Sequence, residues 1–536
     1  MKDLLEQKFK LEARRLLTML DRNPFGQTVG LFDRCFWHFK TTDFPSAVLQ
    51  MGMAILAKLY ILDESFRNPT TLNWIQKSIG ATVKLQHSDG TFDEWYPNER
   101  GWAGPTGYLL NAFCDTYLAV GAQLDDHSQK SLLALISKSA LALTEGSEGH
   151  VLTNHLAIVW LALVQAKSIL KRSDFDLTIQ SVKQQILANF NEEEGWSLEY
   201  DGADPGYQTG TLSFLSKGFA FERDPDLMRC AEKSLHFISH FAYPDGSFGG
   251  AVGSRHTVNT FFAGFVAWRS HPIGRALCDH LEFALKSNQV TMPSDLDDHY
   301  YVYRLYELLD AYSFLLKVEP HQQPAQLPSE FSHKKTFSRA GLHTRREGDI
   351  YSVISVARGG VVMAWNCRTR QKMIQDNGFV VSVGRRDYAS LWQGDYQSKV
   401  DDAFIQVSGP LYPVTPKQFS PLRQVVFRLV VLIFGNHVKT ANWLKDTIKA
   451  FLIMNRPARA KSFSRAIEFS PSGITVKTQV SLDKKPNRIV MGGEFWTRYV
   501  PQSRSYSNLD NWKGCETKTL RTYDRQFSHI EYYGVN

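Results

Sequence analysis

The chain has 536 residues, of which 43% are hydrophobic and 21% charged, and this ordinary globular composition excludes a disordered chain. Its length exceeds that at which one hydrophobic core usually stops growing, so two or three domains are expected. The net charge is +7, and the segment from Pro421 to Ser462 carries the same excess, with eight basic residues and one acid. The rest of the chain is neutral on balance, so no nucleic-acid partner is predicted.

The N-terminal residues MKDLLEQKFKLEARRLLTML interrupt every apolar cluster with charges, which predicts an amphipathic helix and not a secretory signal. The sequence contains no uncharged apolar run long enough for a transmembrane helix. Its six cysteines are scattered without close pairs, a pattern that fits neither a disulfide framework nor a zinc site. We therefore expect free thiols, no metal site and a cytoplasmic protein.

Residues 1–318 show apolar residues at three- and four-residue spacing, interrupted by clusters of Gly, Pro and Asp. Loops rich in Gly, Asp and aromatic residues recur about every fifty residues, an interval that fits a helix pair with a long connecting loop. These loops span residues 86–106, 145–154, 192–210 and 243–257. We predict helical hairpins that close into an α/α toroid. An open α-solenoid is the alternative, although its loops are usually short.

Residues 319–335 (EPHQQPAQLPSEFSHKK) are polar and contain prolines, which is typical of a linker. From residue 336 to residue 536 the apolar period changes to two, in β-branched runs such as DIYSVISVARGGVVMAWNC and AIEFSPSGITVKTQVSL. This pattern predicts an antiparallel β-sandwich domain.

Residues 421–462 interrupt that β domain and are predicted to form a helical insertion. Its first half is strongly apolar, and its second half has an apolar helical face with Lys445, Asp446 and Lys449 off that face. The apolar face consists of Trp443, Leu444, Ile448, Phe451 and Leu452. The insertion either packs on the body of the protein or forms a peripheral anchor on an anionic membrane surface.

The first loop reads LQHSDGTFDEWYPNERGWAGPTG and combines aromatic rings with charged groups. Flat rings suit the apolar faces of sugars, and charged groups suit hydroxyl and carboxylate groups, so we predict a substrate-binding loop. Its candidate residues are Asp93, Glu94, Trp95, Tyr96, Glu99, Arg100 and Trp102. The structural alternative is a loop in which Arg100 pairs with an acid and the rings cap the toroid.

The second and third loops contain titratable groups beside predicted helix starts. Asn154 and His155 place an amide and an imidazole at a helix N-terminus, where anions are favoured, although Asn there also serves as a simple cap. Tyr207 follows Pro205–Gly206, with Asp201 and Asp204 nearby, and a phenol so placed can transfer a proton. The structural alternative is a core tyrosine whose hydroxyl group caps a loop.

The fourth loop places Arg255 and His256 directly after a glycine-rich stretch. Gly246, Gly249, Gly250 and Gly253 allow a ligand to approach the backbone closely. Arg255 is suited to bind a carboxylate, and His256 to move a proton.

With these motifs the chain resembles the heparinase II/III-like polysaccharide lyases and their alginate-lyase relatives, which combine an α/α toroid with a β-sandwich. In that family an Asn and a His of the toroid meet the carboxyl group of the substrate, and a Tyr in a loop with an Asp-Gly pair serves in proton transfer. Asn154, His155 and Tyr207 match these positions, and Asp201–Gly202 supplies the pair. Trp37 and Asp43 resemble the aromatic and acidic residues at the opening of such a toroid.

The β domain departs from the family pattern. Family members commonly bring a strand of the H-x-H-x-D type to the site, but the corresponding stretch here, VVMAWNCRTRQKMIQDNGFVVSVG, contains no histidine. Neither a catalytic histidine nor a metal site is therefore expected from the sandwich.

The resemblance implies β-elimination on an acidic, uronate-containing polysaccharide, with no cofactor. Asn154, with Arg255 or His155, would neutralise the uronate carboxylate. Tyr207 or His256 would then remove the C5 proton, and a tyrosine hydroxyl would protonate the leaving oxygen.

Two alternatives remain open from the sequence. α/α toroids also carry glycoside hydrolases, in which Asp93 or Glu94 would pair with Asp201 or Asp204. A non-catalytic glycan-binding or assembly protein is the other alternative. The expected location at the inner face of a membrane suits bacterial exopolysaccharide biosynthesis.

Overall fold

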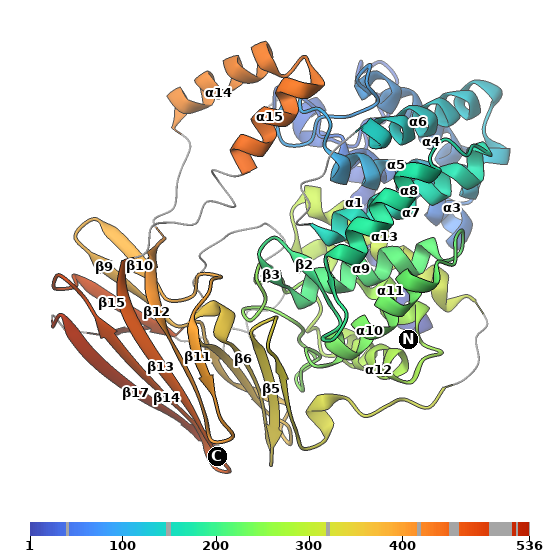
Figure 1. Ribbon diagram of the computed structural model, residues 1–536. Helices are drawn as coiled ribbons and strands as arrows, with labels where there is room; N and C mark the ends of the chain where they lie inside the picture. Colours follow the sequence, from blue (N-terminus) through green and yellow to red (C-terminus); the bar gives the residue numbers. More distant parts are fainter. Residues whose placement is uncertain are drawn as a thin grey trace.

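The computed structural model describes residues 1–38, 42–145, 152–317, 322–414, 420–449, 460–492, 517–520 and 524–534. A helical domain occupies one side of the molecule and a β domain the other, with the N-terminus in the first and the C-terminus in the second (Figure 1). The last long helix of the helical domain ends at Leu315, and the first strand of the β domain begins at His333.

Long helices alternate along the helical domain because apolar positions at helical spacing are separated by capping residues. Asn68, Asp204, Asp224 and Asp297, for example, accept a hydrogen bond from the first turn of the helix that follows. The helices are α1 (Lys2–Met19), α2 (Arg34–Trp37), α3 (Gly52–Leu62), α4 (Pro69–Leu85), α5 (Ala103–Val120), α6 (Asp126–Glu145), α7 (Thr153–Leu170), α8 (Asp176–Ala188), α9 (Pro205–Gly218), α10 (Pro225–Ser239), α11 (Phe262–Ala267), α12 (Pro272–Lys286) and α13 (Asp298–Leu315).

Six of these helices form a closed inner ring. Helix α3 packs on α5, α5 on α7, α7 on α9, α9 on α11, α11 on α13, and α13 packs back on α3. Helices α1, α4, α6, α8, α10 and α12 lie outside them, and the terminal ammonium of Met1 is 3.1 Å from Glu282 of α12. The predicted α/α toroid is confirmed, because an open solenoid would leave α3 and α13 apart.

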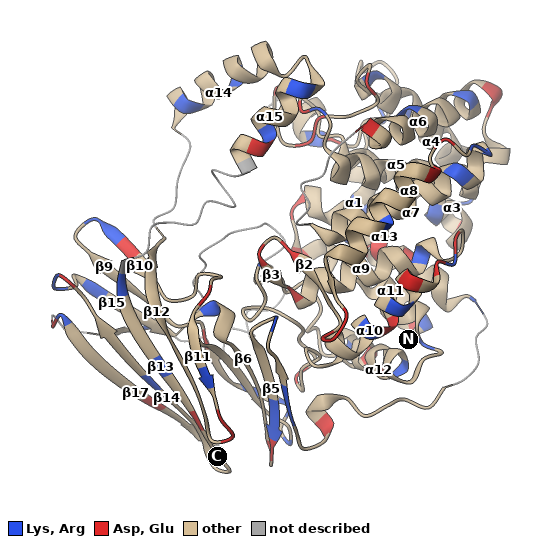
Figure 2. Cartoon of the chain, in the orientation of Figure 1, with Lys and Arg blue, Asp and Glu red and all other residues tan. Residues whose placement is uncertain are grey.

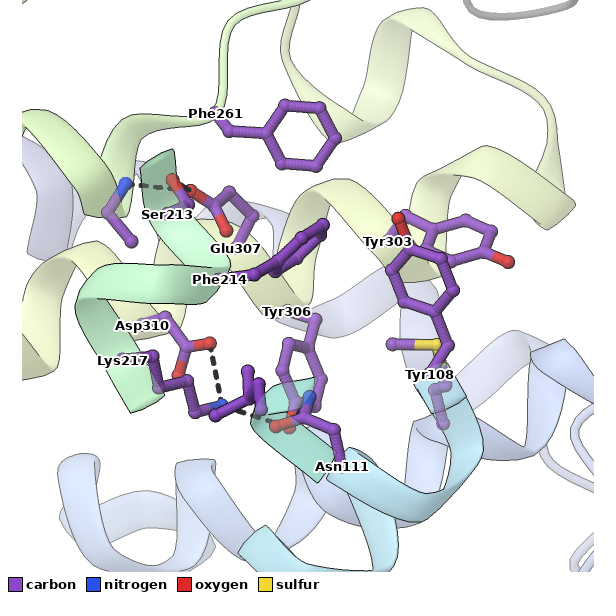
Figure 3. A pocket seen from close by; sticks show the side chains of 13 residues that line it. Tyr108, Asn111, Ser213, Phe214, Lys217, Phe261, Tyr303, Tyr306, Glu307 and Asp310 are labelled. Atoms are coloured by element: carbon purple, nitrogen blue, oxygen red, sulfur yellow. Dashed lines mark hydrogen bonds and ion pairs between the residues drawn. The ribbon is translucent and has the colours of Figure 1, made fainter. Parts of the chain in front are cut away.

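Charged residues close the ring at its centre. Lys58 of α3 bridges Asp115 of α5 and Asp310 of α13 at 2.7 and 2.6 Å, and Lys217 of α9 contacts the same two carboxylates at 2.6 and 3.0 Å. Figure 3 shows Lys217 beside Asp310, close to Tyr306. Burial opposes the charge of Asp115, but Lys217 and Lys58 hold the pKa of this carboxyl group far below its ordinary value.

All six inner helices run in the same direction, because each follows an outer segment of the chain. Their N-termini therefore share one end of the ring, here called the loop end. The four predicted loops at 86–106, 145–154, 192–210 and 243–257 all lead from an outer helix into an inner one. Topology alone thus brings them to the loop end, although residues 146–151 lie outside the described residues.

The described residues of the β domain form two antiparallel sheets. The first has the order β4-β5-β6-β7-β8, with β4 (His333–Phe337), β5 (Leu342–Glu347), β6 (Ile350–Ser355), β7 (Val361–Asn366) and β8 (Gln371–Asp376). The second has the order β16-β15-β9-β10-β12-β13-β14-β17, with β11 paired to β12. Its strands are β9 (Phe379–Val383), β10 (Arg386–Ala389), β11 (Gln397–Val400), β12 (Phe404–Pro413), β13 (Ala460–Ser470), β14 (Gly473–Ser481), β15 (Arg488–Gly492), β16 (Thr517–Leu520) and β17 (Gln526–Gly534).

The two sheets share an apolar core, which confirms the predicted sandwich. Ile354 and Val362 of the first sheet pack with Val407, Ile467 and Val476 of the second. A buried ion pair between Asp376 and Arg465 also joins the sheets.

The first sheet also packs on the loop end of the ring. The ring of Trp365 in β7 stacks on Tyr243 with 3.9 Å between centroids, and Arg358 donates a hydrogen bond to the carbonyl oxygen of Gly253 at 2.7 Å. Buried residues of the toroid and of this sheet belong to one continuous apolar core.

The predicted helical insertion forms a hairpin between β12 and β13, consisting of α14 (Pro421–Phe434) and α15 (Val438–Lys449). It lies apart from both sheets and beside the helical domain (Figure 1). Phe427 packs on Tyr96, Arg428 lies 3.0 Å from Asp43, and Lys445 donates to the carbonyl oxygen of Gly101 at 3.1 Å. Phe451, Leu452 and the basic residues Arg456 and Arg459 lie outside the described residues.

In the part of the chain that the structure describes, no helix is both long enough and apolar enough to cross a bilayer. The five described cysteines are free thiols, and Cys515 lies outside the described residues.

Candidate functional site

An arc of aromatic and imidazole rings crosses the loop end of the toroid. Its members come from the first loop, α5, α7 and α13, and each touches the next. The centroid distances are 4.6 Å for Trp95–His299, 5.8 Å for His299–Tyr303, 4.7 Å for Tyr303–Tyr108, 6.4 Å for Tyr108–His155 and 6.4 Å for His155–Trp102. Three predicted site residues, Trp95, Trp102 and His155, are therefore brought together here. Trp95 is 44% exposed, which leaves ring surface for a ligand.

Hydrogen bonds within the first loop shape it and occupy most of its acidic groups. Glu99 accepts from the backbone N–H groups of Glu94 and Trp95 at 3.0 and 2.9 Å, and burial raises its pKa well above the ordinary value. Asp93 lies 2.6 Å from His87 and accepts from the N–H of Glu99 at 2.9 Å. Arg100 pairs with Asp89 at 3.4 Å, as in the structural alternative. These groups support the loop, and the carboxylate of Glu94 faces His299 at 3.0 Å.

Asn154 is held by Glu199, a residue that no motif of the sequence distinguishes. The backbone N–H and the side-chain amide of Asn154 donate to the two carboxylate oxygens of Glu199 at 2.8 and 2.7 Å. Glu199 is fully buried, and this burial raises its pKa well above the ordinary value. Asn154 is the second residue of α7 and does not cap it, so the simple capping interpretation is wrong.

Glu199 ends one strand of a short hairpin made of β2 (Trp196–Glu199) and β3 (Gly202–Ala203), which follow β1 (Phe190–Asn191). Tyr200 in its two-residue turn has φ 64°, a strained value for a residue with a side chain. The guanidinium of Arg255 lies 3.4 Å from the centroid of the Tyr200 ring. Arg255, from the fourth loop, is thereby fixed beside the third loop.

Asp204 has a structural role. It caps α9 by accepting from the N–H of Tyr207 at 3.1 Å, and its other oxygen accepts from the N–H of Arg255 at 2.9 Å. Its neighbour Asp201 is half-buried in the same turn as Tyr200. Asp204 thus ties the third and fourth loops together.

Tyr207 lies in the first turn of α9 and is 7% exposed. Burial, with Tyr200 and Tyr300 nearby, raises its pKa well above the ordinary value, and Arg255 acts in the opposite direction. The phenol therefore keeps its proton at neutral pH. It is a proton donor in its resting state.

His256 faces the sandwich. It is 2% exposed, and its pKa lies well below the ordinary value. Burial is the main cause, and the positive charges of Arg358 and Lys372 lower the pKa further. These two cations come from the β domain, whose corresponding strands contain no histidine. The neutral His256 lies at the junction between the domains.

Three other predicted residues have contacts of their own. The indole N–H of Trp37 donates to the carbonyl oxygen of Met19 at 3.3 Å. Tyr96 and Asp43 contact the hairpin α14–α15 through Phe427 and Arg428. These three residues support the loop end but do not belong to the arc of aromatic and imidazole rings.

Residues of the inner helices, including two members of the arc, line a small cavity (Figure 3). Its volume of about 20 Å³ is enough for a water molecule. Tyr108 and Tyr303 line it, and so does Asn111, whose buried side-chain oxygen has no partner among the described residues. Within the described ranges, no group of three or more His, Cys, Asp or Glu side chains is placed to hold a metal ion.

No protein-family model matches the sequence, and no curated protein matches it either. Among solved structures, the chondroitin AC lyase of Streptomyces coelicolor A3 in complex with chondroitin sulphate superimposes with a TM-score of 0.57. The two chains are 10% identical, and the match covers 92% of this chain and 68% of that enzyme. A tyrosine-to-alanine variant of the enzyme matches with a TM-score of 0.52, 11% identity and the same coverage.

This chain has the fold of a polysaccharide lyase. The lyase fold, an α/α toroid followed by a β-sandwich, is the one that the sequence resemblance implied. Heparinase III also matches, with a TM-score of 0.49, 10% identity, and coverage of 82% of this chain and 64% of that one. At such low identity the match establishes the fold alone.

Proposed function

We propose that this protein is a carbohydrate-active enzyme that cleaves an acidic, uronate-containing polysaccharide by β-elimination. The observation that carries the proposal is the convergence of Asn154, Tyr207, Arg255 and the ring arc at the loop end. N-termini of the inner helices meet there too, and their dipoles favour an anionic substrate. The solved lyase with the same fold was captured with chondroitin sulphate, which supports the same class of substrate.

Each group has a role that follows from its surroundings. The side-chain amide of Asn154 has a second N–H, which makes no hydrogen bond within the described residues and is suited to the uronate carboxylate. Arg255 adds positive charge beside it and lowers the free energy of the carbanion that forms when C5 loses its proton. Tyr207, protonated at rest, is placed to donate a proton to the leaving oxygen.

The geometry favours elimination over hydrolysis by paired carboxylates. Asp93 and Asp204 are occupied by hydrogen bonds that hold their loops, and Glu94 faces His299. A hydrolase needs two carboxyl groups across the scissile bond, one of them ready to give a proton. Asn154 and Arg255 instead suit the stabilisation of a carboxylate.

The test is incubation with a panel of uronate-containing polysaccharides and detection of the C4=C5 double bond by its ultraviolet absorbance. We expect absorbance with at least one acidic polymer, loss of turnover by about a hundredfold or more in Tyr207→Phe, and retained binding. Reducing ends without the absorbance would establish a hydrolase. Binding without any turnover would favour a glycan-binding protein.

A second proposal concerns the hairpin α14–α15, which we infer to bind an anionic membrane surface. On α14, apolar residues at helical spacing form an exposed face, and basic residues lie on the same hairpin (Figure 2). The exposed apolar residues are Leu422, Val425, Val426, Leu429, Leu432, Ile433 and Phe434, with Trp443 on α15. Such an anchor suits a role in bacterial exopolysaccharide biosynthesis at the inner face of the membrane.

Sedimentation with phosphatidylglycerol vesicles tests the anchor. The double substitution Leu432→Ser with Ile433→Ser should reduce binding at least tenfold, because it removes apolar area from the exposed face. Leu177→Ser on α8 is the matched control, since that leucine is 87% exposed elsewhere. Equal sedimentation of wild type and double variant would refute the anchor.

A further inference from the structure

His299 and Glu94 form a carboxylate–imidazole pair at the rim of the loop end. Nε2 of His299 lies 3.0 Å from a carboxylate oxygen of Glu94, whose side chain is only 3% exposed. Trp95 covers the imidazole ring at 4.6 Å, and Tyr300 and Tyr303 pack at 5.0 and 5.8 Å. The imidazole is therefore fixed by three rings and one buried carboxylate.

The elimination proposed above needs a proton acceptor as well as a donor. Tyr207 keeps its proton at neutral pH, so it suits the donor role. His256 is buried at the domain junction beside Arg358 and Lys372. His155 is adjacent in sequence to Asn154, on the side where the uronate carboxylate is proposed to bind. His299 lies across the arc from it, on α13.

The two ring nitrogens of His299 have different surroundings. Nε2 lies 3.0 Å from the carboxylate of Glu94 without making a hydrogen bond to it, and a carboxylate at this distance favours a proton on the nearer nitrogen. Nδ1 then carries the lone pair; it has no hydrogen-bond partner in the described ranges and, unlike Nε2, it is not among their buried unpaired atoms.

We propose that His299, oriented by Glu94, is the base that removes the C5 proton of the uronate; the proposal rests on the proposed elimination. Nδ1 takes the proton, and the electrons of the C5–H bond form the C4=C5 double bond. The C4–O bond breaks, its electron pair stays on the leaving oxygen, and that oxygen takes the proton of Tyr207. His299 then loses its proton to water, and water reprotonates Tyr207. Glu94 is a positioning residue, since it acts through the imidazole.

Exchange of the C5 proton in heavy water separates the base from the acid, because exchange needs only the base. The assay follows loss of the C5 proton signal of a uronate oligosaccharide by nuclear magnetic resonance, alongside unsaturated product. Tyr207→Phe should retain exchange and lose elimination. His299→Gln should lose both by about a hundredfold or more while keeping its binding constant and melting temperature. His127→Gln, at an exposed position on α6, is the matched control and should keep both activities.

Two further variants test the pair itself. His299→Ala should regain part of its exchange activity when free imidazole is added, which a purely structural role does not predict. Glu94→Gln should lower kcat about tenfold or more with little change in KM, because the loop keeps its shape but the imidazolium loses its counter-ion.

The proposal is overturned if His299→Gln retains elimination, or if it loses exchange no more than His127→Gln does. Those results would be compatible with the lyase function but would mean that another residue removes the C5 proton. If the wild type shows neither exchange nor elimination on any acidic polymer, the proposed function fails, and the role of His299 fails with it.

Discussion

Asn154 shows how a single residue combines a structural and a functional task. Its amide satisfies a buried carboxylate on one side and, as proposed, keeps a second N–H for a substrate carboxylate on the other. The strained turn at Tyr200 and the stacked Arg255 lie within the same group of loops. Backbone strain of this kind persists only where the surroundings enforce it, and it is common at functional sites.

Asn154→Ala should reduce elimination by about a hundredfold or more and lower stability by about 1–3 kcal/mol. The loss of stability follows because one oxygen of the buried Glu199 carboxylate loses its donor. Thermal unfolding and initial rates measure the two effects. Asn68→Ala is the control, because it removes the N-terminal cap of α4, far from the loop end, and should cost stability alone. Equal activity of both variants would contradict the role of Asn154.

The position of His155 depends on a glycine. A β-carbon at Gly104 in α5 would lie 2.4 Å from Nδ1 of His155, so the close packing of this imidazole on α5 requires a residue without a side chain. Gly104→Ala should therefore displace His155 and raise KM severalfold. Gly80→Ala on α4 is the matched control, because its β-carbon would meet open space. An unchanged KM in Gly104→Ala would show that His155 does not contact the substrate.

At the scale of the elements, α13 carries both the closing contacts of the ring and two members of the arc. Much of the helix arrangement was predictable from the sequence. The four loops rich in Gly, Asp and aromatic residues recur about every fifty residues because outer and inner helices alternate, and this alternation brings the loops to one end of the ring. The partners of the predicted residues were harder to predict. Glu199 and His299 lie in stretches where neighbouring residues follow a strand or helix pattern, so only the three-dimensional pairing reveals them.

Glu307 of α13 makes the stability of the folded protein depend on pH. Burial, with Asp310 nearby, raises its pKa from 4.5 to about 7. Between these values the folded protein holds a proton that the unfolded chain has lost, so stability falls as the pH rises from about 4.5 to about 7. Glu307→Gln should remove this dependence and stabilise the protein by up to about 3 kcal/mol at pH 8. Denaturant unfolding at several pH values checks it, and a wild type with a flat profile would contradict it.

At the scale of the molecule, the sandwich supports the loop end, and the hairpin α14–α15 covers the outside of the first loop. The sequence predicted both domains and the insertion, since each has its own apolar period. It did not predict the junction, because the stacking of Trp365 on Tyr243 joins residues with no pattern in common. The absence of a histidine strand was visible in the sequence, and the structure shows Arg358 and Lys372 near His256 in the junction.

Trp365→Ala should destabilise the protein by about 3–5 kcal/mol, because it empties a large buried site between the domains. It should also lower activity, since the loop that packs on Trp365 carries Arg255. Trp365→Phe keeps most of the stacking and should retain both properties. Calorimetric unfolding with parallel activity assays measures them. Wild-type activity in Trp365→Ala would show that the sandwich does not hold the site.

We propose that the loop end of this toroid breaks the C4–O glycosidic bond of a uronate polymer by β-elimination. The most direct measurement is the ultraviolet absorbance of the unsaturated uronate during incubation with chondroitin, heparan and alginate-type polymers, for the wild type and Tyr207→Phe. We expect a rising absorbance for the wild type with at least one polymer, and a rate lower by about a hundredfold or more for the variant. A wild type that binds these polymers but never produces the absorbance would contradict it.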